Sequence, residues 1–178
     1  VAVDIGGTHA RFAIASIGAD GTISLDAPET LHTADHASFQ TAWEAFRDRK
    51  GGTLPQAVSI AIAGPVGSPG KPNPVIRFTN NPWIIRPALI PEKLGASHYT
   101  IVNDFAAVAH AVARADDSQF LHLAGPDQPL GREGTISVIG PGTGLGVAHL
   151  YRSGAIYRVQ ATEGGHIDFA PLDSIEDA

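Results

Sequence analysis

The sequence predicts an α/β protein with a mixed β-sheet, and three observations lead to this fold class. A glycine-containing turn joins two apolar, β-prone runs within Val1–Ala15, which indicates an antiparallel hairpin. Two apolar runs of strand length, Ala57–Ala63 and His98–Val102, are typical of parallel strands covered on both faces. A similar Gly/Thr turn between apolar runs recurs in Val138–Tyr151, and this internal echo indicates the start of a second, similar lobe.

Length and composition describe an ordinary globular protein. The 178 residues suffice for one domain or somewhat more, with 43% hydrophobic and 17% charged residues. No apolar run has the length of a membrane span and no segment resembles a signal peptide, so we expect a cytoplasmic protein without a membrane partner. The absence of cysteine excludes disulfides, thiolate zinc sites and cysteine nucleophiles. A net charge of −6 argues against a nucleic-acid surface.

The first hairpin is expected to continue as a meander and then a helix. Thr22–Ala27 offers a third strand after the turn Ala19–Gly21. Ser38 is placed to cap a helix whose aromatic residues follow helical spacing as far as Gly51. Trp43 in this helix is expected to pack in the core.

The middle of the chain is expected to be irregular. Gly67–Pro74 is rich in Gly and Pro and predicts a surface loop, and Val75–Phe78 predicts a strand. Asn80 and the adjacent Asn81 belong to a predicted turn before a proline. The alternative role of Asn80 is to offer its amide to a polar ligand beneath Trp83 as an aromatic wall. Arg86–Leu94 predicts a short helix interrupted by proline.

The last third of the chain contains a helix, a crossing loop and the second hairpin. Phe105–Ala115 is Ala-rich and predicts a helix, and the polar stretch Asp116–Arg132 predicts a connection between lobes. A short strand pair is expected around Ser153. We therefore expect a first lobe over 1–115 and the beginning of a second over 116–178. The chain opens inside a strand without Met and ends on SIEDA, which predicts a fragment of a longer protein.

The first turn has the features of a phosphate-binding loop. Gly6 and Gly7 lack side chains, so backbone N–H groups can approach anionic oxygens closely. A strand follows this turn, whereas the Walker and Rossmann motifs both open into a helix, so neither motif applies. A purely structural hairpin turn remains the alternative, and the echo at Gly142 and Thr143 favours phosphate binding.

Two carboxylates are candidates for chemistry. Asp104 lies where a strand ends and a helix begins, next to Asn103, and a carboxylate there can take the proton of a substrate hydroxyl during phosphoryl transfer. Capping of the helix is the alternative role of Asp104. Asp4 ends the first strand and can hold Mg²⁺ through water, unless it only completes the turn.

Glu163 and His166 form a third candidate group. They are spaced i, i+3 around two glycines, which suits paired hydrogen bonds to vicinal hydroxyls and leaves space for a sugar ring. A zinc site would need a third ligand, and none is suitably spaced.

Four motifs, DIGGTHARFA, the NDF at Asn103 to Phe105, GPGTGLGVAHL and EGGHIDFAP, resemble the bacterial glucokinase family. This family belongs to the superfamily of sugar kinases, actin and heat-shock ATPases, and the motifs occur in its order over nearly the whole chain. The resemblance implies a ribonuclease H-like, actin-like ATPase lobe. It also implies phosphorylation of the 6-hydroxyl of glucose by ATP and Mg²⁺, between two lobes of a protein that forms a homodimer.

Carried over position by position, the resemblance implies a role for each motif residue. Asp104 is similar to the catalytic base and Asp4 to the carboxylate on the metal side. The implied sugar ligands are Asn103, Glu163 and His166, with Asn80 as a further candidate. The implied phosphate-binding residues are Gly6, Gly7 and Thr8 in the first turn and Gly142, Thr143 and Gly144 in the second.

The chain departs from the family pattern in three respects. His9 stands where such motifs often have Asn. A related family carries a cysteine-rich zinc motif after its E-x-G-H, whereas this chain has FAPLDS, which predicts the zinc-free branch. Family members are longer, and the remainder would hold a further sugar-binding Glu, the adenosine site and the dimer contacts. A non-catalytic sugar-sensing module and a nucleotide-driven chaperone or filament protein remain alternative functions.

Overall fold

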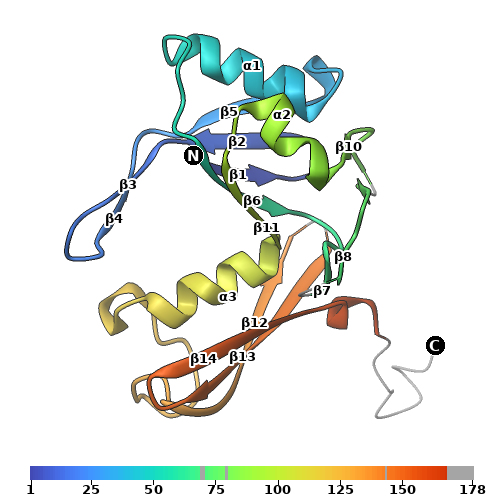
Figure 1. Cartoon of the computed structure of the whole chain (residues 1–178). Coiled ribbons are helices and arrows are strands. Elements are labelled where there is room, and N and C mark those ends of the chain that lie inside the picture. Colours follow the sequence, from blue (N-terminus) through green and yellow to red (C-terminus); the bar gives the residue numbers. More distant parts are fainter. Residues whose placement is uncertain (69–70, 79, 143, 168–178) are drawn as a thin grey trace. The chain divides into compact units, whose positions relative to one another are not determined.

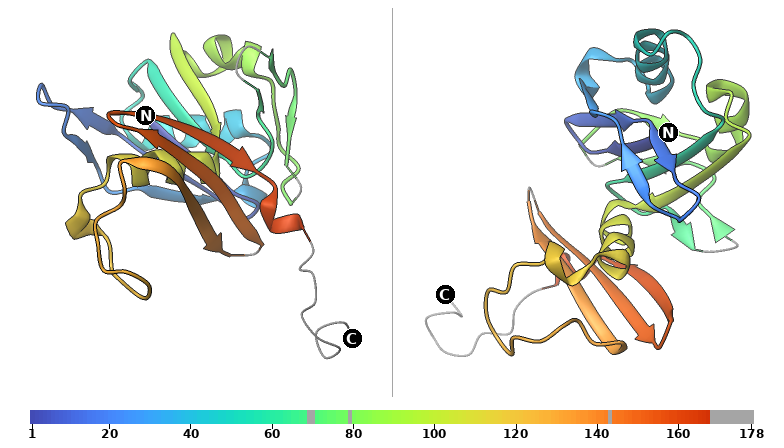
Figure 2. Two further views of the ribbon diagram at one scale, coloured as in Figure 1. Left: turned by 90° about the horizontal axis from the view of Figure 1, so that it is seen from below. Right: turned by 90° about the vertical axis from the view of Figure 1, so that its left-hand side faces the viewer.

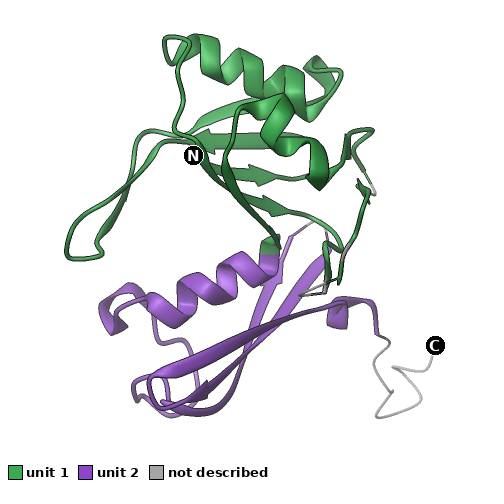
Figure 3. Ribbon diagram, viewed as in Figure 1, with its two compact units in different colours: residues 1–104 green, residues 105–178 purple. Residues whose placement is uncertain are grey.

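The chain divides into two units, Val1–Asp104 and Phe105–Ala178 (Figures 1 and 3). The computed structural model describes residues 1–68, 71–78, 80–142 and 144–167. Within these residues, no helix is long and apolar enough to cross a membrane.

A mixed sheet with strand order β11-β6-β1-β2-β5 forms the centre of the first unit (Figure 1). β1 pairs with β2, and β2 with β5, in antiparallel fashion, whereas β6 lies parallel to both β1 and β11. The predicted mixed α/β fold is therefore confirmed. The strands of this sheet are β1 (Ala2–Ile5), β2 (His9–Ala13), β5 (Glu29–His32), β6 (Ala57–Ile62) and β11 (His98–Asn103).

The third strand of the meander is not the predicted one. Within Thr22–Ala27, β4 (Ile23–Leu25) pairs with β3 (Ala15–Ile17) in a separate exposed ribbon. β5 takes the place beside β2 instead, and its Leu31 is buried. The segment around Leu31 has one large apolar residue among polar neighbours, which is why alternation alone did not indicate a strand.

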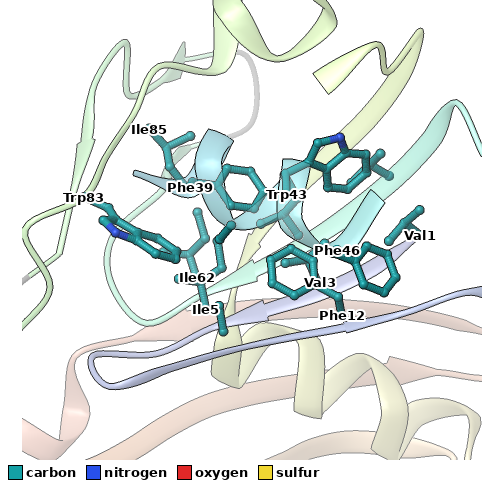
Figure 4. Packing of buried hydrophobic residues seen from close by; sticks show 14 of the residues in the cluster. Val1, Val3, Ile5, Phe12, Phe39, Trp43, Phe46, Ile62, Trp83 and Ile85 are labelled. Carbon is teal, nitrogen blue, oxygen red and sulfur yellow. The ribbon is translucent and has the colours of Figure 1, made fainter. Parts of the chain in front are cut away.

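The core of the first unit lies on one face of the sheet, under α1 (Phe39–Arg49) and α2 (Ile90–Leu94) (Figure 4). Ser38 caps α1 as predicted, since its hydroxyl accepts from the Thr41 N–H and the Thr41 hydroxyl accepts from the Ser38 N–H. The buried aromatic side chains of this core are Phe12, Phe39, Trp43, Phe46 and Trp83.

Three sequence-based expectations about burial are wrong. β6 is not covered on both faces: Val58 and Ile60 are buried, but the alternate Ala57 and Ser59 are exposed, because these small residues cost little in water. β11 ends the strand order and is exposed over its first half. Trp83 is no wall for a ligand, because it is 1% exposed and its indole N–H donates to the His36 carbonyl.

Short elements connect β6 to β11. The predicted strand within Val75–Phe78 is confirmed as β9, which pairs with β10, a strand that the sequence did not indicate. The predicted loop Gly67–Pro74 holds the small paired strands β7 and β8. These elements and the short helices of the unit are β7 (Gly67–Ser68), β8 (Lys71–Pro72), β9 (Ile76–Arg77), β10 (Ile84–Ile85), η1 (Thr33–Asp35) and η2 (Pro87–Leu89).

The second unit is an antiparallel meander with α3 along one face (Figures 1 and 2). The predicted second hairpin is present, because β12 pairs with β13 and β13 pairs with β14. Ala109 of α3 is buried against Val138 and Ala148 of the sheet. The elements are α3 (Asp104–Arg114), η3 (Asp117–Gln119), β12 (Glu133–Pro141), β13 (Leu145–Ser153), β14 (Ile156–Thr162) and η4 (Gly164–His166).

Asp26 ties the long hairpin to α1. Its carboxylate accepts from the Ile14 N–H at 2.7 Å and from Lys50 Nζ at 2.7 Å, and Lys50 also lies 3.5 Å from Glu29. The Lys50 ammonium, followed by the Ile14 N–H, holds the pKa of Asp26 below its usual value.

We expect Asp26→Asn to make stability less dependent on acid pH. A carboxyl whose pKa is lower in the folded than in the unfolded chain stabilises the fold at pH values above its ordinary pKa of 3.8. This contribution is lost as the pH falls below that value. Urea unfolding followed by circular dichroism should show the variant less stable at pH 7, with a smaller difference at pH 3. Asp48→Asn, at an exposed carboxylate of α1, is the control. A difference that stays constant with pH would contradict this prediction.

Candidate functional site

Three parallel strands of the first unit end at the same level of the sheet. Ile5 of β1 and Asn103 of β11 are both register partners of Ile62 in β6. The next residues along the two outer strands are Gly6, which opens the glycine turn, and Asp104. Neighbouring strands are about 4.8 Å apart, so the glycine turn and Asp104 leave the same sheet edge roughly 10 Å from each other. The unit therefore brings the first predicted phosphate turn and the candidate base together.

Hydrogen bonds to its backbone carbonyl oxygens hold the first glycine turn in place. The Thr33 hydroxyl donates to the Gly7 carbonyl at 2.8 Å, and the Thr33 N–H donates to the Thr8 carbonyl at 2.9 Å. Asn81 Nδ2 donates to the Gly6 carbonyl at 3.2 Å. Among the groups that the structure describes, no acceptor faces the N–H of Gly7 or of Thr8. Fixed carbonyls and available N–H groups are the arrangement that binds an anion.

Thr33 and Asn81 are supporting residues that sequence reasoning missed. They are 3% and 6% exposed, and the side-chain oxygen Oδ1 of Asn81 also accepts from the Trp83 N–H at 2.9 Å. The sequence predicts both Asn80 and Asn81 in one turn and singles out only Asn80 as a candidate ligand. Nothing in the local sequence distinguishes the two amides, because what marks Asn81 is its hydrogen bond to the Gly6 carbonyl, which is distant in the chain.

Asn80 lies against the glycine turn. A Cβ built on Gly7 would stand 3.0 Å from Asn80 Cβ and 3.3 Å from the Asn80 carbonyl oxygen. A side chain at this position would displace Asn80 by a few tenths of an ångström, so glycine here serves close packing. The structure places this predicted sugar ligand beside the first predicted phosphate turn.

Asp4 faces away from the helices of the first unit. It pairs with Arg11 across β1 and β2, with 2.9 Å between Asp4 Oδ2 and Arg11 Nη1, and both side chains are about half exposed. Over the described part of the chain, no three His, Asp or Glu side chains gather as a metal cluster. A single carboxylate with one oxygen already engaged fits a metal held mainly by other ligands, through water, and does not fit a full protein cage.

Asn103 and Asp104 sit where β11 passes into α3. Asn103 Nδ2 donates to the Gly64 carbonyl at 3.4 Å, which links the ends of β11 and β6. Asp104 is the first residue of α3, whereas we expected it to precede the helix as its cap. A carboxylate in the first turn still favours the helix through the macrodipole, so this structural role stands beside the predicted catalytic one.

The second glycine turn resembles the first in kind and differs in length. Its closing pair is Pro141 with Leu145, and the Gly142 N–H donates to the Gly144 carbonyl at 2.7 Å. Thr143 lies outside the described residues. Three residues separate that pair, whereas four separate Ile5 from Ala10 in the first hairpin, so the two turns do not share one register.

Glu163 directly precedes η4, and His166 is its last residue. His166 Nδ1 is 3.4 Å from Glu163 Oε2, and the side chains are 80% and 66% exposed. A Cβ on Gly165 would overlap the carbonyl oxygen of Leu145, and one on Gly164 would stand 3.1 Å from a Thr162 oxygen. The missing side chains of the two glycines let η4 pack on the start of β13, a structural role that the sequence did not indicate. This contact brings the Glu/His pair close to the second glycine turn.

A mixed α/β sheet with a glycine turn and an aspartate at one edge, followed by another glycine hairpin, defines an actin-like α/β fold. Comparison with known families agrees. The glucokinase family model matches residues 1–178, so the chain belongs to the glucokinase family.

Individual relatives give the same picture. The chain is 54% identical over 177 residues to the glucokinase of Zymomonas mobilis, a match that covers 99% of this chain and 53% of that protein. It is 33% identical to the glucokinase of Saccharophagus degradans, with the same coverage. The chain spans about half the length of the curated relatives it matches.

Solved structures are similar over the same half. The crystal structure of a glucokinase from an Antarctic psychrotroph matches with a TM-score of 0.75 at 29% identity, over 99% of this chain and 53% of that one. A glucokinase from Balamuthia mandrillaris, solved in complex with glucose, matches with a TM-score of 0.70 at 24% identity, over 97% and 50% of the two chains. The latter likeness concerns the fold.

We expect Asn81→Ala to loosen the first glycine turn. The substitution leaves the Gly6 carbonyl and the Trp83 N–H without their partner in a buried place, which costs about 1–3 kcal/mol. Urea unfolding should show this loss, and amide hydrogen exchange should become faster at Gly6 and Thr33, whose N–H groups donate to the His9 and Thr8 carbonyls of the turn. Asn73→Ala is the matched control, because that amide also donates to a backbone carbonyl but is exposed. Equal effects of the two substitutions would refute the supporting role.

Proposed function

We propose that the protein containing this chain phosphorylates glucose with ATP, giving glucose 6-phosphate and ADP. The observation that carries this proposal is the shared sheet edge of the first glycine turn and Asp104. Phosphoryl transfer to an alcohol needs the nucleotide phosphates and a proton acceptor held in a fixed relation. Membership of the glucokinase family supports ATP and glucose as the two substrates.

The glycine turns are proposed to bind nucleotide phosphates. In the first turn the N–H groups of Gly7 and Thr8 point to no acceptor among the described groups, and Gly6 completes the loop. The second turn, Gly142–Gly144, is proposed to act in the same way. Backbone donors suit this task because they approach anionic oxygens without needing a positive side chain.

Asp104 is proposed as the base that takes the proton of the 6-hydroxyl of glucose. Its carboxylate needs only to accept one proton as the phosphoryl group is transferred. Asn103 and Asn80 are proposed to bind sugar hydroxyls, because their amides lie at the same edge as the base. Glu163 and His166 are proposed to bind two neighbouring hydroxyls, which their mutual distance of 3.4 Å permits.

Mg²⁺ is proposed to accompany ATP, where it would neutralise phosphate charge. Asp4 is the residue that would hold it, through water. The Arg11 guanidinium occupies one Asp4 oxygen, so the other oxygen is the one available for this contact.

Other features remain predictions from the resemblance. They are the zinc-free branch, consistent with a chain without cysteine, a homodimer, a cytoplasmic location, and lobes over 1–115 and 116–178.

A coupled ADP-release assay with glucose tests the activity. Glucose-dependent ADP release supports the kinase, glucose binding without ADP release would indicate the sugar-sensing module, and ADP release without glucose would indicate the chaperone or filament class.

We expect Asp104→Asn in the full-length protein to lower kcat by about 10²- to 10⁴-fold, which is the usual contribution of a general base. The affinity for glucose should change little, because the amide keeps the shape of the side chain. Steady-state kinetics measure both quantities. Asp127→Asn, in an exposed loop, is the control and should behave as wild type. Unaltered turnover would remove Asp104 from the role of base.

We expect Glu163→Gln to act mainly on sugar binding. Exchange of a charged acceptor for a neutral one weakens its hydrogen bond, and the glucose Kd should rise about tenfold or more. Isothermal titration calorimetry of the full-length protein measures this change. Glu92→Gln, at an exposed carboxylate of α2, is the control. An unchanged glucose affinity would show that Glu163 is not a sugar ligand.

A further inference from the structure

The ring of Phe105 lies on two glycines of the second hairpin. Gly140 of β12 and Gly146 of β13 are directly opposite each other in the register. A Cβ built on Gly140 would stand 2.8 Å from Phe105 Cε1 and nearer still to Cζ, and one built on Gly146 would overlap the ring. Any larger residue at either position would push the ring away.

The ring explains why these two positions are glycine. Neither Gly140 nor Gly146 has the positive φ that disfavours other residues, so their backbone conformation does not require glycine. Both lie in paired strands, outside the turn itself. The remaining reason is space, because the missing side chains make a flat seat for one aromatic ring.

This seat is next to the functional turn. The Gly140–Gly146 pair is followed by the closing pair Pro141–Leu145 and then by the glycine turn. Phe105 belongs to the first turn of α3 and directly follows Asp104 in the chain. The contact of its ring with Gly140 and Gly146 therefore attaches Phe105, the neighbour of Asp104, to the strand ends that carry the second glycine turn.

We infer that Phe105 is a positioning residue for the phosphoryl transfer. Its ring clamps the first turn of α3 to the β12–β13 hairpin, and through the peptide link to Asp104 it limits where that carboxylate can go. This inference rests on the proposed function. A misplacement of about 1 Å at a reacting group costs on the order of 10²-fold in rate, so a loosened clamp should slow the chemical step while leaving substrate binding intact.

The test is a double-mutant cycle on Phe105 and Gly146 in the full-length protein. Phe105→Ala should lower kcat about 10- to 100-fold with little change in the KM for glucose or ATP. Gly146→Ala should do the same, because its Cβ displaces the ring. The double variant should be no slower than Phe105→Ala alone, because without the ring the Cβ has room, and this non-additivity identifies the contact.

Val112→Ala is the matched control. Val112 packs in the same helix-hairpin cluster but two turns further along α3, so its loss should lower the melting temperature without lowering kcat. If Phe105→Ala does not fold, Phe105→Leu replaces it in the cycle. A normal kcat in the folded Phe105 variant, or additive effects of the two substitutions, overturns the inference.

Amide hydrogen exchange separates this inference from the proposed function. Exchange in residues 105–108 should be faster in the Phe105 variant than in Val112→Ala, whatever the enzyme assay gives. A wild type that fails to phosphorylate glucose refutes the proposed function, whereas unchanged exchange in the first turn of α3 refutes the clamp.

Discussion

The parallel pairing of β6 with both β1 and β11 is the constraint on which the rest of the first unit depends. It sets Ile5, Ile62 and Asn103 at one level, so that the residues which follow β1 and β11 emerge at the same edge. Parallel neighbours need long crossover connections, and here the connections carry α1 and α2, which cover one face of the sheet. The packing that buries the core and the alignment that collects polar side chains at the edge are thus consequences of one strand order.

Glycines in the motifs have several physical roles. Gly7 gives room to Asn80, Gly146 gives room to Phe105, and Gly165 gives room to the backbone of Leu145. In each case the missing Cβ allows one part of the chain to approach another closely. A glycine-rich motif in this fold is therefore a set of close contact points within the protein.

The two units contain very different amounts of buried apolar structure. In the first, aromatic residues such as Trp43 and Phe46 are completely buried beneath the helices. In the second, the buried cluster of the described residues is Ala109, Val138 and Ala148, with Phe105 packed beside it. Burial of apolar area is the main stabilising contribution. The loss of one large side chain should therefore remove a larger share of the buried apolar area, and so of the stability, from the second unit than from the first.

The sequence by itself determined the class of fold, both glycine hairpins, the capped helix after Ser38, and the motifs that indicate the glucokinase family. These follow from local signals: alternation, turn residues, capping residues and motif order. Tertiary structure alone decided that β5 completes the meander, that Trp83 is core, that Asn81 supports the turn while Asn80 lies against it, and that Phe105 rests on a glycine pair. The physical reason is that each of these outcomes depends on a partner distant in the chain, and a residue's own neighbours do not reveal which partner it will meet.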